Sequence, residues 1–189
     1  MSLHTDHRAL VAVAALGYLV LTLIIGILPA FEIQRTKPLA DAPARTPEVS
    51  LGRQLYLDDG CGFCHTQFVR GLDMDRPYGR ESLAADYAGE QPPLLGTQRT
   101  GPDLANVGIR QPSEIWHLIH LYNPRAVVPS SVMPAYPWYF LLKDEAAESD
   151  VVVPVPPQFV PPGKIAVASP EALAVVRYLQ SLKQPEVPR

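Results

Sequence analysis

An uninterrupted apolar run near the N-terminus is the feature that most constrains how this chain folds. Residues 9–31 read ALVAVAALGYLVLTLIIGILPAF and contain no charged side chain. As a helix, the run is about 34 Å long, enough to cross a hydrocarbon layer of about 30 Å. The apolar core of a cleaved signal peptide is shorter, about 7 to 15 residues. We therefore expect one retained membrane-spanning helix over 9–31, preceded by a short tail over 1–8.

Proline divides the rest of the chain. There are 21 prolines among 189 residues, roughly twice the usual share of about 5 %. We expect a proline-containing polar tether over residues 32–48 and one domain over residues 49–183. Within it, VVVPVPPQFVPPG at 151–163 excludes a helix and a central strand and predicts an extended surface segment. Residues 169–183 predict a C-terminal helix with Ser169 as its N-cap.

Another helix is expected just before the two cysteines of the chain. Thr46 is suited to cap it and Pro47 to begin it. Gly52 permits a close crossing with another helix, and the C-terminal helix that carries Tyr178 is the natural partner. We therefore predict a mainly α-helical domain with extended proline-rich loops, joined to one N-terminal transmembrane helix.

Composition excludes two classes of protein. The net charge is −3 and no run of Lys or Arg is present, so the chain lacks the basic surface of a nucleic-acid-binding protein. Only two cysteines occur, Cys61 and Cys64, which excludes a disulfide scaffold.

The segment Cys61-Gly62-Phe63-Cys64-His65 has the Cys-x-x-Cys-His pattern of covalent haem attachment. Two thiols at this spacing can reach the two vinyl groups of one porphyrin, and the next side chain then lies under the iron. This predicts one covalently bound haem c with His65 as proximal ligand. A zinc site is the first alternative, but it needs four ligands and no second Cys-x-x-Cys exists. A dithiol redox motif is the second, and no thioredoxin-like βαβ pattern precedes the cysteines.

The second axial ligand must come from a distant segment. Met133 lies 68 residues after His65 in a loop stiffened by prolines, and a thioether raises the reduction potential of haem. Met74 follows His65 by only nine residues, which leaves little chain to pass around the macrocycle. His117 and His120 offer a bis-histidine alternative on a short predicted helix, where we expect both to be partly exposed beside its apolar side.

Other side chains are candidates for the walls of a haem pocket. The carbonyl of Pro102 can accept the Nδ1–H of His65, which would orient the ring. Arg99 and Arg125 are candidates to pair with haem propionates, with solvated surface arginines as the alternative. Residues 66–98 are long for a haem loop and predict either a partner-docking segment or a disordered insertion. Further wall candidates, with core packing as the alternative, are Leu104, Trp116, Tyr136 and Trp138.

Several motifs together resemble the monohaem cytochrome c subunit (FixO/CcoO-like, subunit II) of cbb3-type cytochrome c oxidases. They are Gly52-Arg53-Gln54-Leu55-Tyr56, Cys61-Gly62-Phe63-Cys64-His65-Thr66-Gln67, Arg99-Thr100-Gly101-Pro102-Asp103-Leu104, His120-Leu121-Tyr122-Asn123-Pro124-Arg125 and Met133-Pro134-Ala135-Tyr136-Pro137-Trp138. The resemblance implies a class I-like cytochrome c domain in which His65 and Met133 ligate the iron. Phe68 stands where that family is expected to have methionine, and the proline-rich run 151–163 is not typical of it.

The resemblance also implies a function and partners. A membrane-anchored c-type cytochrome would pass single electrons to a multi-span haem-copper catalytic subunit, and another cytochrome c would serve as donor. The chain itself would carry out no bond chemistry. The electron-input subunit of a nitric oxide reductase, a freestanding membrane-tethered shuttle and a ligand sensor in which Met133 leaves the iron remain alternatives.

The charges that flank the apolar run conflict with the expected orientation. Arg8 precedes the run, whereas Arg35, Lys37 and Arg45 follow it, and a positive-inside count would place the long C-terminal part in the cytoplasm. Covalent haem attachment belongs to the export side. We therefore expect a single-pass protein of the bacterial inner membrane with its haem domain in the periplasm.

Overall fold

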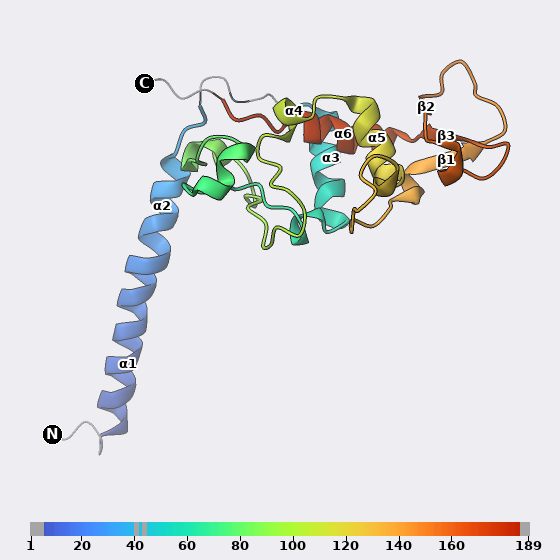
Figure 1. Cartoon of the computed structure of the whole chain (residues 1–189). Coiled ribbons are helices and arrows are strands. Elements are labelled where there is room, and N and C mark those ends of the chain that lie inside the picture. The colour runs from blue at the N-terminus through green and yellow to red at the C-terminus, as the bar shows by residue number, and fades with distance from the viewer. Residues whose placement is uncertain (1–5, 40–41, 43–44, 186–189) are drawn as a thin grey trace. The chain divides into compact units, whose positions relative to one another are not determined.

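The computed structural model describes residues 6–39, 42 and 45–185. By their contacts the residues divide into two units (Figure 1). Among the described residues, the first comprises those up to 39 together with Leu83–Gln91, and the second comprises the remainder.

One long helix dominates the first unit. It runs through α1 (His7–Leu21), the π-helical turn η1 (Thr22–Ile27) and α2 (Leu28–Arg35). The side chain of Asp6 caps it by accepting hydrogen bonds from the backbone N–H groups of Arg8 and Ala9 at 3.1 and 3.2 Å. The helix spans 29 residues, and an 18-residue stretch within it has a mean hydropathy of 2.7, so it is long and apolar enough to cross a membrane. It extends beyond the predicted span at both ends.

Two helices from opposite ends of the second unit pack together: α3 (Pro47–Asp58) and α6 (Pro170–Ser181) (Figure 1). The hydroxyl of Thr46 caps the first by accepting from the backbone of Val49 at 3.2 Å. Ser169 caps the second in the same way, accepting from Ala172 at 3.2 Å. The predicted N-caps are confirmed, although the second helix ends at Ser181 instead of residue 183.

Gly52 is the point of closest approach between α3 and α6. A Cβ atom on Gly52 would overlap the backbone carbonyl of Ala174 and lie 2.8 Å from the Cβ of Tyr178. The rings of Tyr56 and Tyr178 meet edge to face at 5.4 Å beside this crossing. The close crossing predicted at Gly52 is confirmed.

Short helices connect these two. After α3 come the 3-10 turns η2 (Cys61–Phe63), η3 (Asp73–Tyr78) and η4 (Ala84–Tyr87), of which η4 belongs to the first unit. They are followed by α4 (Val107–Arg110), α5 (Glu114–Tyr122), η5 (Pro124–Ala126) and η6 (Pro137–Tyr139). The turn η7 (Pro157–Phe159) precedes α6. Ser113 caps α5 by accepting from the backbone N–H of Trp116 at 3.2 Å.

A small antiparallel sheet, which the sequence did not predict, precedes α6. Its strands β1 (Phe140–Lys143), β2 (Val152–Val153) and β3 (Ile165–Ala168) lie in the order β1-β3-β2. The predicted extended segment 151–163 supplies the edge strand β2 and the turn η7. The central strand, β3, contains no proline, in agreement with the exclusion of a central strand from 151–163.

Two apolar clusters form the core of the second unit. The larger joins the sheet to α5 and α6, and the smaller joins α3, the Leu104 turn and α6. Tyr56 and Tyr178, whose rings meet beside the α3–α6 crossing, both belong to the smaller cluster. The members of the larger cluster include Leu118, Leu121, Tyr122, Tyr136, Phe140 and Val176.

Candidate functional site

The two cysteines lie in the turn that directly follows α3. Cys61 is half-buried and Cys64 is exposed, and both are free thiols. The backbone N–H of His65 donates to the carbonyl of Cys61 at 3.0 Å, which folds the five-residue motif into one turn. Burial, and then the carboxylate of Asp59, raise the pKa of the Cys61 thiol to about 11. Both sulfur atoms and the imidazole are therefore presented from one turn.

His65 is oriented by a carbonyl 37 residues further along the chain. Its Nδ1 lies 2.7 Å from the oxygen of Pro102. Because a carbonyl only accepts, Nδ1 carries the proton and Nε2 keeps its lone pair free for a ligand bond. Burial lowers the pKa of the ring, which favours this neutral form. The predicted hydrogen bond is confirmed.

The turn that carries Pro102 lies directly against the imidazole. A Cβ atom on Gly101 would lie 2.8 Å from Nδ1 and Nε2 of His65, closer than side chains approach one another. The backbone N–H of Gly101 donates to the carbonyl of Cys64 at 3.0 Å. Glycine at this position therefore allows the turn to hold the ring.

The loop of Met133 is tied to the cysteine turn through Tyr136. Met133 is partly buried against the larger cluster. Three residues later, the backbone N–H of Tyr136 donates to the carbonyl of Leu121 at 2.9 Å. Burial, followed by the charge of the nearby Cys61, raises the pKa of the Tyr136 hydroxyl. Met74, in contrast, is 69 % exposed. The structure thus brings the Met133 loop close to the Cys61–His65 motif through Tyr136, whereas Met74 lies at the surface.

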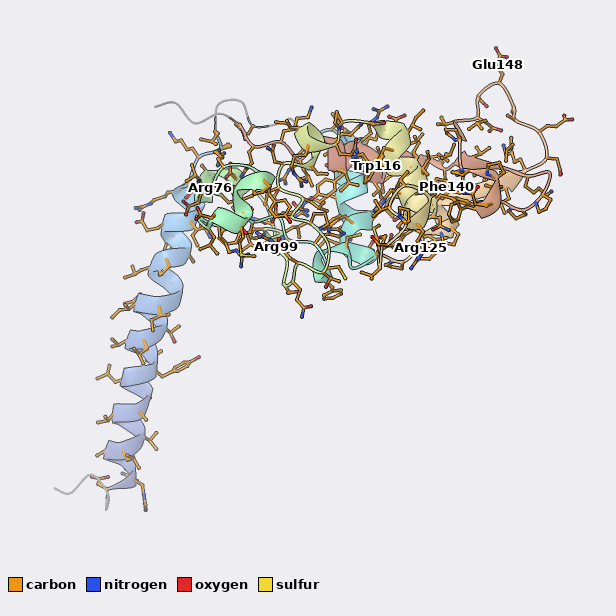
Figure 2. The ribbon with its side chains drawn as sticks, in the orientation of Figure 1. Arg76, Arg99, Trp116, Arg125, Phe140 and Glu148 are labelled. Carbon is orange, nitrogen blue, oxygen red and sulfur yellow. The ribbon has the colours of Figure 1, made fainter. Side chains whose placement is uncertain are left out.

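The two arginine candidates have different surroundings, and Figure 2 shows them well apart. All three guanidinium nitrogens of Arg99 donate to protein oxygens, chiefly to the carboxylate of Asp75. Arg125 is exposed, and its Nη1 lies 3.5 Å from the carbonyl of Met133. Of the two, Arg125 keeps more of its donors available for a propionate; both roles stay predictions.

The remaining wall candidates also differ in burial. Leu104 is buried in the smaller cluster, and Tyr136 is buried in the larger. Trp138 is 63 % exposed, so core packing does not account for it. The ring of Trp116 stacks on that of His120, with 4.6 Å between centroids and 11° between planes.

The expectation that both histidines of α5 are partly exposed is wrong for His117. Its side chain is buried because the carbonyl of Gln111 satisfies it, with Nε2 donating at 2.8 Å. His120 is half-buried, and its Nδ1 is a buried nitrogen without a hydrogen-bond partner among the residues that the structure describes. Burial, followed by the charges of His117 and His65, lowers the pKa of His120 to about 4.

These side chains fit a haem. Two free thiols precede His65, a neutral histidine whose Nε2 is available for a ligand bond. The thioether of Met133 lies on the loop that brings Tyr136 close to Cys61. The unsatisfied nitrogen of His120 is the kind of group that a bound cofactor satisfies. They fit a metal ion alone poorly. Over the described residues, no group of three or more His, Cys, Asp and Glu side chains is arranged to hold one.

Sequence reasoning missed the ion pairs behind His65. Asp75 and Asp103 are buried carboxylates. Asp103 stands in the turn that the sequence analysis singled out, but its position there did not indicate burial. Nothing in the sequence marks Asp75 as buried, because one of its two arginine partners, Arg99, lies 24 residues away.

A long apolar helix that could span a membrane, a domain of helices and one small sheet, and this set of side chains together fit a cytochrome-type haem protein. The family model for the cytochrome c oxidase mono-haem subunit, FixO, matches residues 3–156, and the chain belongs to this family. A comparison with curated proteins gave no match. Membership makes the chain a haem-carrying subunit of a cytochrome oxidase, which takes part in electron transfer together with a catalytic subunit.

Proposed function

We propose that this chain is the monohaem c-type subunit of a cbb3-like terminal oxidase, and that it passes single electrons to the haem-copper catalytic subunit. The observation that carries the proposal is the arrangement of the Cys61–His65 motif, in which Nδ1 of His65 is held by Pro102 and Nε2 stays free. The family match supports the oxidase assignment.

The chain's own residues would hold the cofactor and set its properties. When bound, the haem supplies a one-electron ferric/ferrous couple. Cys61 and Cys64 would hold it through two thioether bonds. Nε2 of His65 and the sulfur of Met133 would ligate the iron, and a thioether ligand favours a high potential. Pro102 keeps the imidazole in one tautomer and one orientation.

The anchor suits this role. A single helix of 29 residues, with an 18-residue stretch of mean hydropathy 2.7, would keep the haem domain at the membrane surface. We place the domain on the periplasmic side of a bacterial inner membrane, because covalent haem attachment takes place after export. A soluble or membrane-bound cytochrome c would then serve as the electron donor.

Two related roles differ from this one in what accompanies the chain. A freestanding shuttle would carry the same haem but form no stable complex, whereas a nitric oxide reductase would contain a catalytic subunit with a different terminal activity. A ligand sensor would bind carbon monoxide at an iron that Met133 has left.

The test is purification of the full chain from its native membrane in mild detergent, followed by an optical spectrum and identification of the co-purifying subunits. We expect one c-type haem per chain together with b-type haem and a multi-span partner that reduces oxygen. A Cys61→Ala/Cys64→Ala variant is the control and should lose the c-type signal. A c-type signal without a partner would overturn the oxidase role in favour of the shuttle, and absence of haem from the wild type would overturn both.

A further inference from the structure

A cluster of charged side chains surrounds two buried carboxylates near His65, and the proposed function assigns these carboxylates no role. Asp75 and Asp103 are both 0 % exposed. Nη2 of Arg99 donates to Asp75 at 2.9 Å and lies 3.4 Å from Asp103, while its Nη1 also donates to Asp75. Nε of Arg70 donates to Asp75 at 2.9 Å. Because unpaired buried charges are costly, these four groups fix one another in place.

The cluster is connected to His65 through the next residue, Thr66. Nε of Arg99 donates to the Thr66 hydroxyl at 2.7 Å, and that hydroxyl donates to Asp103 at 2.6 Å. The carbonyl of Thr66 accepts from the backbone of Leu104 at 2.8 Å. Arg99 precedes Pro102 in the same turn and Asp103 follows it directly, so these contacts hold the chain on both sides of the residue whose carbonyl accepts from His65.

Asp75 comes from the long segment after the motif, which the sequence analysis left as a docking segment or a disordered insertion. In the structure its first part, residues 66–82, is anchored by buried groups. Asp75 accepts from the backbone N–H of Arg70 at 2.8 Å. The ring of Tyr78 lies 5.2 Å from the guanidinium of Arg99 and 5.1 Å from that of Arg110. These contacts fasten the segment to the turn that holds Pro102.

We propose that Asp75 and Arg99 are positioning residues that act through Thr66 and Asp103 to hold the Pro102 carbonyl against His65. The proposal rests on the role of His65 as axial ligand in the proposed function. A firm hydrogen bond from Nδ1 makes the imidazole a stronger electron donor to the iron, which favours the ferric state. Loosening the turn therefore weakens that donation and raises the reduction potential.

Two substitutions that conserve charge separate positioning from electrostatics. Thr66→Val removes the hydroxyl between Arg99 and Asp103. Arg99→Lys keeps the positive charge but cannot make the same forked contacts. We expect both variants to raise the reduction potential of the haem-loaded protein and to speed solvent exchange of the His65 Nδ1 proton, measured by NMR. If the cluster acts only through its charge, neither variant will shift the potential, and the proposal is wrong.

Asp75→Asn has a matched control in Asp73→Asn. Both remove one negative charge from η3, but the side chain of Asp73 is 89 % exposed and forms a surface ion pair with Arg76 at 2.7 Å. We expect the Asp75 variant to raise the potential and speed proton exchange, and the Asp73 variant to change neither. The proposal is wrong if the Asp75 and Asp73 variants have equal effects. It is also wrong if the Asp75, Thr66 and Arg99 variants are less stable but keep the wild-type potential and proton exchange. If the Asp75 variant fails to fold, the two charge-conserving variants decide.

Failure of this inference is distinguishable from failure of the proposed function. The wild-type protein is first examined for a haem that remains on the denatured chain and for histidine ligation in its spectrum. Absence of either removes the basis of both proposals. A wild type that shows both, with potentials and proton exchange unchanged in the Thr66 and Arg99 variants, overturns only the positioning role.

Discussion

Nδ1 of His65 and the carbonyl oxygen of Pro102 lie 2.7 Å apart although 37 residues separate them in the chain. This hydrogen bond fixes the tautomer of the imidazole and leaves the lone pair of Nε2 available for a ligand bond. The two residues belong to turns that are themselves joined by the hydrogen bond from Gly101 to Cys64. The histidine is thus oriented by backbone groups of the protein itself.

Gly101→Ala tests how closely the Pro102 turn must approach the ring. The new methyl group would overlap the imidazole of His65, so we expect displacement of the turn and a lower yield of haem-loaded protein with an altered axial-ligand spectrum. Gly62→Ala is the control, because the nearest atom to its added methyl group is a ring carbon of Tyr56 at 3.9 Å. Normal haem loading and a normal spectrum in the Gly101 variant would contradict the tight approach.

Gly52→Ala tests the crossing of α3 and α6. The added methyl group would overlap the carbonyl of Ala174. The helices must separate to admit it, and we expect the free energy of unfolding to fall by about 1–3 kcal/mol despite the better helix propensity of alanine. Denaturant unfolding in mild detergent measures the change. Gln54→Ala, at an exposed position of the same helix, should alter stability by no more than about 0.5 kcal/mol. A Gly52 variant as stable as wild type would refute the close crossing.

The buried carboxylate of Asp75 predicts a dependence of stability on pH. The guanidinium groups of Arg99 and Arg70 hold the pKa of Asp75 well below its usual value in the folded state. The carboxylate therefore stabilises the fold above its unfolded pKa of about 4, and this stabilisation is lost as the pH falls below that value.

Replacing Asp75 should reduce this dependence. In Asp75→Asn, we expect the free energy of unfolding to be lower by about 3 kcal/mol at pH 7, and to fall less between pH 5 and pH 3 than in the wild type. Asp73→Asn should follow the wild-type curve. Parallel curves for the Asp75 variant and the wild type would show that this carboxylate does not carry the acid sensitivity.

Met133→Ala tests the second axial position. Removal of the thioether should open one side of the iron, lower the reduction potential and permit binding of carbon monoxide to the reduced protein. Met74→Ala should have the spectrum and potential of the wild type, because Met74 is exposed. An unchanged six-coordinate spectrum in the Met133 variant would contradict ligation by Met133. The candidate would then be His120, whose Nδ1 is buried without a hydrogen-bond partner in the described part of the chain.

Local signals in the sequence predicted the elements that position the motif. Thr46 and Ser169 have the side chains that cap helices, and each is followed by a proline that suits the first turn. Gly52 indicated a crossing because no side chain occupies that position. The hydrogen bond between His65 and Pro102 followed from the needs of a ligating histidine.

Long-range pairing explains what the sequence could not predict. The strand Ile165–Ala168 is too short to show a period, and it forms only because Phe140–Lys143 and Val152–Val153 lie on either side. His117 has the polarity of a surface residue but is buried because the carbonyl of Gln111 happens to be within reach. Asp75 likewise has no local feature that distinguishes it from its exposed neighbour Asp73.

Covalent retention of haem by the purified chain tests the central claim most directly. The full-length protein from its native membrane would be denatured and its intact mass and c-type haem absorbance recorded, with Cys61→Ala/Cys64→Ala beside it. We expect one haem that stays on the wild-type chain after denaturation and is absent from the double variant. A wild-type chain that carries no haem, or that loses its haem on denaturation, would contradict it.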